Sequence, residues 1–399
     1  MLGQTPEGNA GGGRRRGTSP RAGLVGAVIA AAAVIAAIAL IAVTQGGGRS
    51  GPQTRSASGH PVASVPLHVV SVTPAAHSGR VDGSTAVQVT FSTPLAAGSP
   101  RPVLTPAVTG SWQASGSLLT FTPDLPLAPA TRFTLRVPAG EAGVRSAAGR
   151  LLARPVSATF RTGGYSQLRL AELLSQLGYL PLSWQPTAGG RLTGGQAGSG
   201  LAAQEAMAYS APPGSFSWYP GYPRDLHGQW LPGRPNALVR GAVMAFQAQR
   251  GMAINGDATA RLWHALFAAA ASGQANTVGY TYAIASKGSP ETLTIWHDGH
   301  IVLHSLANTG IGVAPTASGT FPVYLRFRFQ IMSGTNPDGS HYADPVSFVS
   351  YFDAGEAVHY FPRGSYGWPQ SLGCVELPYS DAERAWPYLT YGSLVTVTG

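Results

Sequence analysis

The chain has 399 residues, 44% of them hydrophobic, which is enough for roughly two or three domains with cores of their own. Charged residues make up only 11%, against 52 glycines and 32 prolines, a composition typical of strand- and loop-rich exported proteins. The net charge of +9 is almost all arginine, since Lys287 is the only lysine. Beyond the N-terminal tail no basic cluster is interleaved with aromatic residues, so we expect no nucleic-acid partner.

The first 65 residues predict a tail, a membrane anchor and a linker. Residues 1–21 form a basic tail with four arginines, and residues 22–43 form an uninterrupted apolar run. A helix of this length, at about 1.5 Å per residue, spans a hydrocarbon core of roughly 30 Å. The preceding arginines predict a single-pass cell-membrane protein with its N-terminus inside and all later domains outside. A cleaved signal peptide is the alternative, although no A-x-A cleavage site follows. Residues 44–65 are Gly/Ser-rich and predict a flexible linker.

Residues 66–162 predict a small β-sandwich. Their apolar residues alternate with polar ones in short runs separated by proline and glycine, the period of half-buried strands; the runs are Val87, Val89 and Phe91, then Leu119 and Phe121, then Phe133, Leu135 and Val137. The stretches VTFSTPL and ATFRT resemble bacterial Ig-like domains. No catalytic constellation occurs here, so we interpret the domain as a spacer or interaction module.

Residues 165–273 predict a helical domain. The pattern changes to helical spacing, with four leucines at positions 170, 173, 174 and 177 followed by Gly178. After a Gly-, Pro- and aromatic-rich insertion at 182–234, a second helix is predicted behind Asn236 and a third behind Asp257. The stretches LAELLSQLGYLP and RGAVMAFQAQRGMAINGDATARLWHAL resemble the peptidoglycan-binding helical domain. A generic three-helix core is the alternative, because periodicity alone fits any bundle.

Residues 277–399 predict a mainly β domain of about 120 residues. Alternating runs begin at Tyr280, and Asp298-Gly299 predicts a hairpin turn. Alternation from Phe321 to Gln330 predicts one long strand, and Val395 and Val397 close the chain. The predicted fold class is therefore multidomain: a transmembrane helix, an Ig-like sandwich, a helical domain and a C-terminal mainly β domain.

The stretch AVHYFPRGSYGWPQSLGCVELP carries the candidate chemistry. It places His359 upstream of Ser371, Gly373 and Cys374, across a Pro/Gly-rich loop. Cys374 is the only cysteine, so it forms no intramolecular disulfide. Nucleophilic chemistry at sulfur requires a thiolate, and a nearby imidazole can take the proton. The N–H groups of Gly373 and Cys374 are candidates to bind an oxyanion.

This stretch resembles the L,D-transpeptidase (YkuD-like) catalytic domain, whose hallmark is His-Gly, a loop, then Ser-His-Gly-Cys-[Ile/Val]-Arg-[Leu/Met]. Upstream, NTGIGVAPTASGTFPV resembles another element of the same family. Three positions depart from the hallmark: Tyr360 replaces glycine, Leu372 replaces histidine and Glu376 replaces arginine. A carboxylate near the thiol tends to raise its pKa. Whether another arginine, such as Arg363, compensates cannot be read from the spacing.

The resemblance implies an enzyme that attacks the third residue of a peptidoglycan tetrapeptide stem, expels D-alanine and forms a cross-link. Cys374 would be the nucleophile and His359 the base, with His341 in GSHYADP as the rival base. Supporting roles would fall to Gly373, Ser371 and Tyr360 around the oxyanion, and to Glu376, Arg363 and Tyr342 in substrate binding. The implied partners are stem peptides and glycan, with carbapenem β-lactams as inhibitors.

No metal or organic cofactor is expected, since one cysteine with scattered histidines lacks zinc-ligand spacing. Two other functions stay open. One is an L,D-carboxypeptidase, in which water resolves the acyl-enzyme. The other is a non-catalytic cell-wall scaffold with a degenerate active loop.

Overall fold

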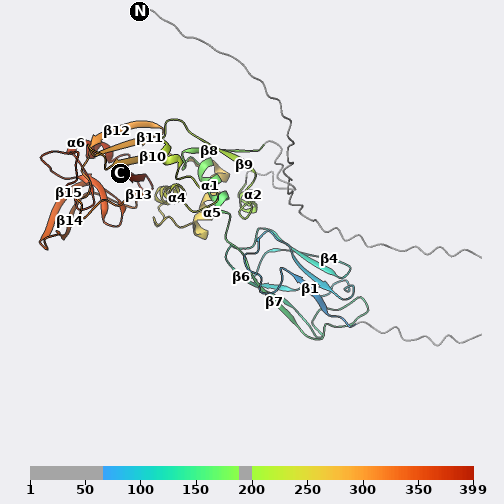
Figure 1. Ribbon diagram of the computed structural model, residues 1–399. Helices are drawn as coiled ribbons and strands as arrows, with labels where there is room; N and C mark the ends of the chain where they lie inside the picture. Colours follow the sequence, from blue (N-terminus) through green and yellow to red (C-terminus); the bar gives the residue numbers. More distant parts are fainter. Residues whose placement is uncertain (1–65, 188–199) are drawn as a thin grey trace, which may run out of the picture. The chain divides into compact units, whose positions relative to one another are not determined.

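The computed structural model describes residues 66–187 and 200–399 (Figure 1). None of the helices in these two ranges is long and apolar enough to cross a membrane. The longest, α4 (Ala237–Gln249) and α5 (Ala260–Ser272), have 13 residues each. That is about 20 Å at the α-helical rise, short of a hydrocarbon core of about 30 Å. This finding corrects the predicted fold class and the predicted single-pass membrane location. The anchor predicted at 22–43 lies outside the described residues, as do the tail and the linker.

The Ig-like segment folds into two antiparallel sheets. One sheet has the order β1-β2-β5-β4 and the other the order β3-β6-β7. Inward-facing residues of both sheets share one core, as their alternation predicts. The strands are β1 (Val69–Thr73), β2 (Val87–Phe91), β3 (Val103–Thr105), β4 (Gly110–Ser115), β5 (Leu118–Pro123), β6 (Arg132–Val137) and β7 (Val156–Arg161).

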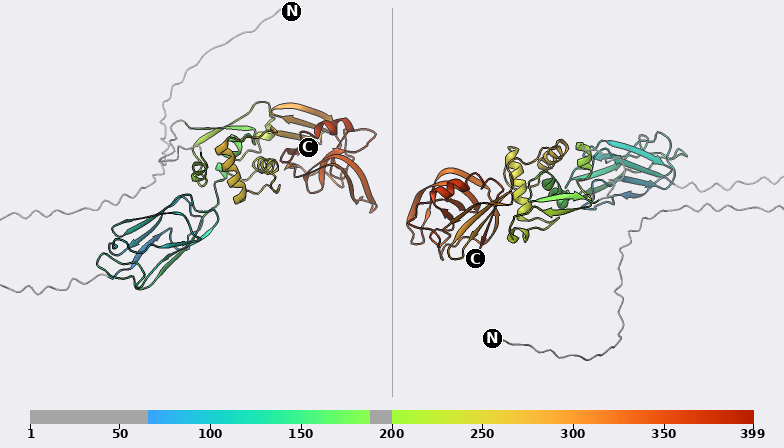
Figure 2. Two further views of the ribbon diagram at one scale, coloured as in Figure 1. Left: turned by 180° about the vertical axis from the view of Figure 1, so that it is seen from behind. Right: turned by 90° about the horizontal axis from the view of Figure 1, so that it is seen from above.

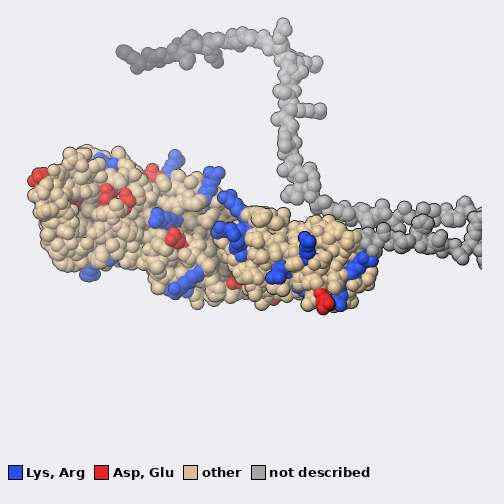
Figure 3. All heavy atoms as spheres, turned by 90° about the horizontal axis from the view of Figure 1, so that it is seen from below, with Lys and Arg blue, Asp and Glu red and all other residues tan. Residues whose placement is uncertain are grey.

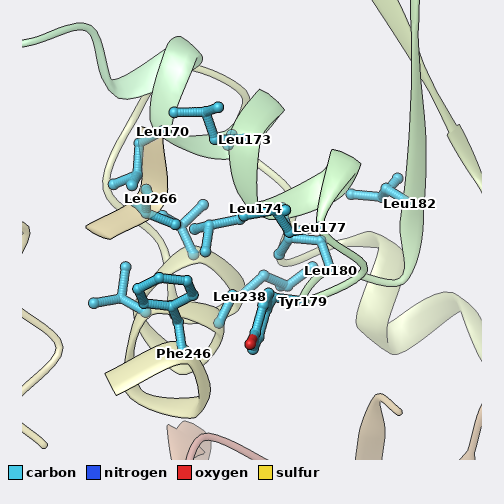
Figure 4. Packing of buried hydrophobic residues seen from close by; sticks show 14 of the residues in the cluster. Leu170, Leu173, Leu174, Leu177, Tyr179, Leu180, Leu182, Leu238, Phe246 and Leu266 are labelled. Carbon is cyan, nitrogen blue, oxygen red and sulfur yellow. The ribbon is translucent and has the colours of Figure 1, made fainter. Parts of the chain in front are cut away.

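Three helices, α1 (Gln167–Gln176), α4 and α5, pack through their leucine and aromatic faces (Figure 4). Each begins at a polar cap that accepts a backbone N–H: Ser166 for α1, Asn236 for α4 and Thr259 for α5. The predicted helices are present, and the third begins at Ala260, three residues beyond Asp257.

The insertion at 182–234 contains secondary structure that its composition did not indicate. Over residues 182–187 and 200–234, which the structure describes, it forms the antiparallel strand pair β8–β9 and two short helices. Buried Arg169 of α1 ties it to the bundle by donating to Gln204 of α2 at 2.6 Å; the same guanidinium also donates to Glu172 within α1 at 3.1 Å. The elements are β8 (Leu182–Pro186), α2 (Leu201–Ala206), β9 (Gly214–Trp218) and α3 (Arg224–His227).

The C-terminal segment, orange to red in Figures 1 and 2, is built from two sheets. A five-stranded sheet has the order β12-β11-β10-β18-β13, and a four-stranded sheet has the order β14-β15-β16-β17. Apolar residues of both sheets and of α6 (Tyr379–Ala385) share a core. The strands are β10 (Thr281–Ser286), β11 (Thr292–His297), β12 (His300–Leu306), β13 (Gly319–Pro322), β14 (Leu325–Thr335), β15 (His341–Asp353), β16 (Glu356–Tyr360), β17 (Val375–Leu377) and β18 (Leu394–Thr398).

The long strand predicted from Phe321 to Gln330 is wrong as a single element. Its first part is β13, which pairs with β18, and its second part is β14, which pairs with β15 in the other sheet. Buried Val323 lies at the crossing between them. The alternation continues across the crossing, so the sequence pattern contains no break.

The helical and C-terminal segments share one apolar core. Tyr282 and Leu394 of the five-stranded sheet, and Tyr280 just before β10, belong to the same buried cluster as the helix leucines. The backbones of the two segments also approach closely at Gly241 of α4 and Gly392. A Cβ added to Gly241 would lie only 2.5 Å from the Gly392 carbonyl oxygen. On the face shown in Figure 3, charged side chains are scattered among wide uncharged areas.

Candidate active site

The pairing of β16 with β17 brings the predicted nucleophile and base to one face. The strands are parallel, with His359 opposite Glu376. Cys374 lies two residues before Glu376, and side chains two apart in extended backbone point the same way. The side chains of His359, Glu376 and Cys374 therefore project together. Val358 and Val375 project to the opposite face and enter the core.

These three side chains line a cavity of about 720 Å³. The hairpin β14–β15 and the loop between β16 and β17 supply most of the rest of its lining. Of the other predicted site residues, Ser371, Arg363 and Tyr342 line the same cavity.

The geometry of His359 defines its protonation. The ring is 3% exposed, and Nδ1 lies 3.0 Å from the carbonyl oxygen of Tyr360. Since a carbonyl oxygen only accepts, Nδ1 carries the hydrogen and Nε2 has the free lone pair. Burial lowers the pKa of His359, against the opposing effects of the Tyr360 carbonyl and the Glu376 charge. The imidazole is therefore neutral at neutral pH and able to accept a proton.

The environment of Cys374 keeps its sulfur protonated. The side chain is partly exposed, and Sγ lies 3.9 Å from the Gly355 carbonyl oxygen. Burial raises the pKa of the thiol to about 12; a hydrogen bond from Ala357 opposes the rise, and the charges of Glu376 and Glu356 add to it. The thiol is therefore not ionised before substrate binds, and nucleophilic attack requires transfer of its proton to a base.

Ser371 and Gly373 shape the turn before the thiol. Buried Ser371 donates from Oγ to the Cys374 carbonyl at 2.6 Å and accepts from the Gly373 N–H at 3.1 Å. Gly373 has a φ of +115°, which favours glycine. The Gly373 N–H, one of the two predicted oxyanion donors, is engaged in this bond. The Cys374 N–H is the remaining candidate of that pair.

A braced segment at 308–311 supports this turn. Asn308 exchanges two backbone hydrogen bonds with Glu376, at 3.0 and 2.9 Å, and the Thr309 carbonyl accepts from the N–H of Ser371 at 3.0 Å. The buried carboxylate of Glu291 in turn accepts from the N–H and hydroxyl of Thr309, at 2.6 and 2.7 Å. Sequence reasoning missed Glu291, since its partner is 18 residues away and no spacing rule links them.

Arg363 neutralises the carboxylate that replaces the hallmark arginine. Its guanidinium donates to both oxygens of Glu376 at 2.8 Å, and to the Gln370 carbonyl at 3.1 Å. The Glu376 side chain is 5% exposed. A positive charge is thus present at this wall of the cavity, supplied from the loop rather than from position 376.

One face of the hairpin β14–β15 turns toward the cavity. The register pairs Met332 with Asp344 and Gly334 with Tyr342, so Tyr342 and Asp344 lie on one face. Both line the cavity. Sequence reasoning missed Asp344, although period-two alternation from Tyr342 would have found it.

Two predicted residues lie elsewhere. Tyr360 packs on the core face, with its ring centroid 5.1 Å from that of Tyr379, and does not line the cavity. The extra ring at the hallmark glycine position is therefore accommodated away from the thiol. His341, the rival base, is exposed at the start of β15, 3.2 Å from Thr335 Oγ1, and is also outside the lining.

Comparison with known proteins identifies two domains of the chain. The family model of the L,D-transpeptidase catalytic domain matches residues 280–397, and that of the bacterial Ig-like domain matches residues 63–162. The C-terminal segment is therefore an enzyme domain, preceded by an Ig-like domain. The chain therefore carries an L,D-transpeptidase catalytic domain at residues 280–397.

Solved structures similar to this chain include three L,D-transpeptidases. One from Mycobacterium smegmatis is 14% identical, with 84% of this chain and 100% of that chain covered and a TM-score of 0.29. L,D-transpeptidase 3 from Mycobacterium tuberculosis, with a faropenem-derived adduct, is 16% identical (83% and 98% covered; TM-score 0.29). The catalytic domain from E. faecium, acylated by ertapenem, is 25% identical (30% and 97% covered; TM-score 0.27). No curated protein matches the sequence.

Proposed function

We propose that the chain cross-links peptidoglycan stems through an acyl-enzyme on Cys374, with His359 as general base. The observation that carries this proposal is the shared face of β16 and β17, from which the thiol and a neutral imidazole line one cavity. The family match at residues 280–397 supplies the reaction class.

In the first half-reaction, Sγ of Cys374 attacks the carbonyl carbon of the third stem residue. The thiol proton moves to Nε2 of His359 as the C–S bond forms. The C–N bond to the terminal D-alanine then breaks, and Nε2 returns the proton to the leaving amine. We assign the Cys374 N–H as the donor to the transient oxyanion.

In the second half-reaction, an amine of a neighbouring stem attacks the thioester. A C–N bond forms, the C–S bond breaks, and the amine proton passes through His359 back to sulfur. An L,D-carboxypeptidase would use water here, and product analysis with and without an amine acceptor separates the two outcomes.

The test is acylation of the full chain by a carbapenem, followed by intact-mass spectrometry. Ring opening adds the whole β-lactam, and the single cysteine makes the site of addition unambiguous. We expect an adduct on the wild-type chain, none on Cys374→Ser, and acylation slowed roughly 100-fold or more in His359→Asn. An unmodified wild-type chain with a titratable thiol would instead support the non-catalytic scaffold.

A further inference from the structure

The charges around the catalytic cavity are unbalanced. Four charged side chains line it: Asp338, Asp344, Arg363 and Glu376. Arg363 and Glu376 neutralise each other in their two-point pair. Asp338 is held in the turn of the hairpin, where it accepts from the N–H and hydroxyl of Ser340 at 2.9 and 2.6 Å. In the part of the chain that the structure describes, Asp344 has no hydrogen-bond or ion-pair partner.

Asp344 lies on the inner face of β15, next to the groups that surround the thiol. It shares that face with Tyr342. Burial raises the pKa of Tyr342, and the neighbouring Cys374 sulfur and Asp344 carboxylate add to the increase. Asp344 also helps to raise the pKa of Arg363, after the larger contribution of Glu376. One carboxylate without a counter-ion thus affects the pKa values of both Tyr342 and Arg363. This negative charge stands out in a chain whose net charge is +9.

We propose that Asp344 binds the positively charged amine of the acyl acceptor. This inference rests on the proposed function, because it names the group that selects the second substrate. A partly buried carboxylate favours a cation and disfavours an anion at the same position. Asp344 thereby favours an amine over water as the group that resolves the acyl-enzyme.

The chemical step stays balanced. The bound ammonium releases one proton to solvent and becomes a neutral amine. The nitrogen then attacks the thioester carbon, the C–S bond breaks, and the second proton passes through Nε2 of His359 to the sulfur of Cys374. Asp344 takes no proton and forms no covalent bond, so its effect falls on acceptor binding.

The experiment compares two acceptors on the full chain with a D-alanine-terminated tetrapeptide donor. Nα-acetyl-lysinamide is cationic at neutral pH, whereas hydroxylamine is uncharged. We expect Asp344→Asn to raise KM for the cationic acceptor roughly fivefold or more, and to leave KM for hydroxylamine unchanged. Asp344→Glu should keep the preference for the cation. Asp338→Asn, the matched control in the same hairpin, should leave both KM values unchanged.

Equal changes for both acceptors, or none for either, would overturn the assignment. A fivefold increase in KM for the cationic acceptor in Asp338→Asn would also overturn it, because the effect would then come from the overall negative charge of the cavity and not from Asp344. Carbapenem acylation of Cys374 in the wild-type chain separates this result from the proposed function. If the wild-type chain itself forms no adduct, the proposed function fails before the acceptor is tested.

Discussion

Arg363 and Glu376 form a two-point ion pair across the wall of the catalytic cavity, with both N–O distances at 2.8 Å. Glu376 is nearly enclosed, whereas 27% of the Arg363 side chain remains exposed. Removing one partner therefore has a different consequence from removing the other. A bare carboxylate would be trapped at position 376, but a bare guanidinium at position 363 can turn to solvent.

This asymmetry predicts unequal losses of stability. We expect Arg363→Met to lower the free energy of unfolding by about 3 kcal/mol, because it leaves a buried charge without a partner. Glu376→Gln should cost only about 1 kcal/mol, since the amide oxygen still accepts from the guanidinium. The double variant should recover part of the loss of Arg363→Met. Urea unfolding measures all four proteins, and a larger loss for Glu376→Gln than for Arg363→Met would contradict the proposed asymmetry.

The acylation rate should fall, as the pH is lowered, only below the usual pKa range of histidine. Burial lowers the pKa of His359, so the imidazole stays neutral and basic at pH values where an exposed histidine is protonated. We expect the carbapenem acylation rate to stay level from pH 9 to pH 7 and to reach half its maximum below about pH 6.5. Stopped-flow acylation over pH 5–9 measures this. A midpoint above pH 7 would indicate a stabilised imidazolium instead.

The same pKa shift predicts a dependence of stability on pH. The unfolded chain binds a proton at its free histidine near pH 6.5, whereas folded His359 binds one only at lower pH. The unfolded state therefore gains more protons on acidification, and the free energy of unfolding falls as the pH drops below about 6.5. His359→Asn should show a shallower fall between pH 6.5 and 5 in urea titrations.

Gly373 should resist substitution because of its backbone. A Cβ at this residue would lie 3.1 Å from an oxygen of Glu356, and the φ of +115° is strained for any other residue. The Glu356 side chain can move, but the backbone strain remains. We expect Gly373→Ala to cost about 1–3 kcal/mol of stability and to slow acylation. Glu356→Ala should not restore either property; full recovery in the double variant would show that the side-chain contact was the cause.

Gly241 should reverse the usual effect of alanine in a helix. Replacing a helical glycine by alanine ordinarily stabilises by about 1 kcal/mol. In α4 the added Cβ would lie 2.5 Å from the backbone oxygen of Gly392, which a rotamer change cannot relieve. We expect Gly241→Ala to destabilise by about 2 kcal/mol. Gly228→Ala, where the nearest atom is 3.6 Å away, is the control and should be nearly neutral by thermal unfolding.

Local patterns in the sequence were sufficient for the alternating strands of the sandwich and for the capped helices. Each of these depends on residues close together in the chain. The division between β13 and β14 was not predictable, because alternation continues through Val323 while the strand partners change. Glu291 was missed for the same reason: its role depends on Thr309 meeting it in three dimensions.

The partnership of Arg363 with Glu376 illustrates the same limit within the site. The sequence shows a carboxylate where the family has an arginine, and that substitution alone predicts reversed charge beside the thiol. The loop geometry that returns Arg363 to the carboxylate depends on the Gln370 carbonyl and on the register of β17. Neither this contact nor this register can be predicted from composition and spacing.

The apolar cluster that includes Tyr280, Tyr282 and Leu394 together with the helix leucines sets where this protein can be divided. If residues 277–399 were fused alone to another protein, the apolar residues on one side of the five-stranded sheet would be exposed to solvent and would promote aggregation. Module exchange should therefore place its junction ahead of residue 165 and move the bundle and the enzyme domain together.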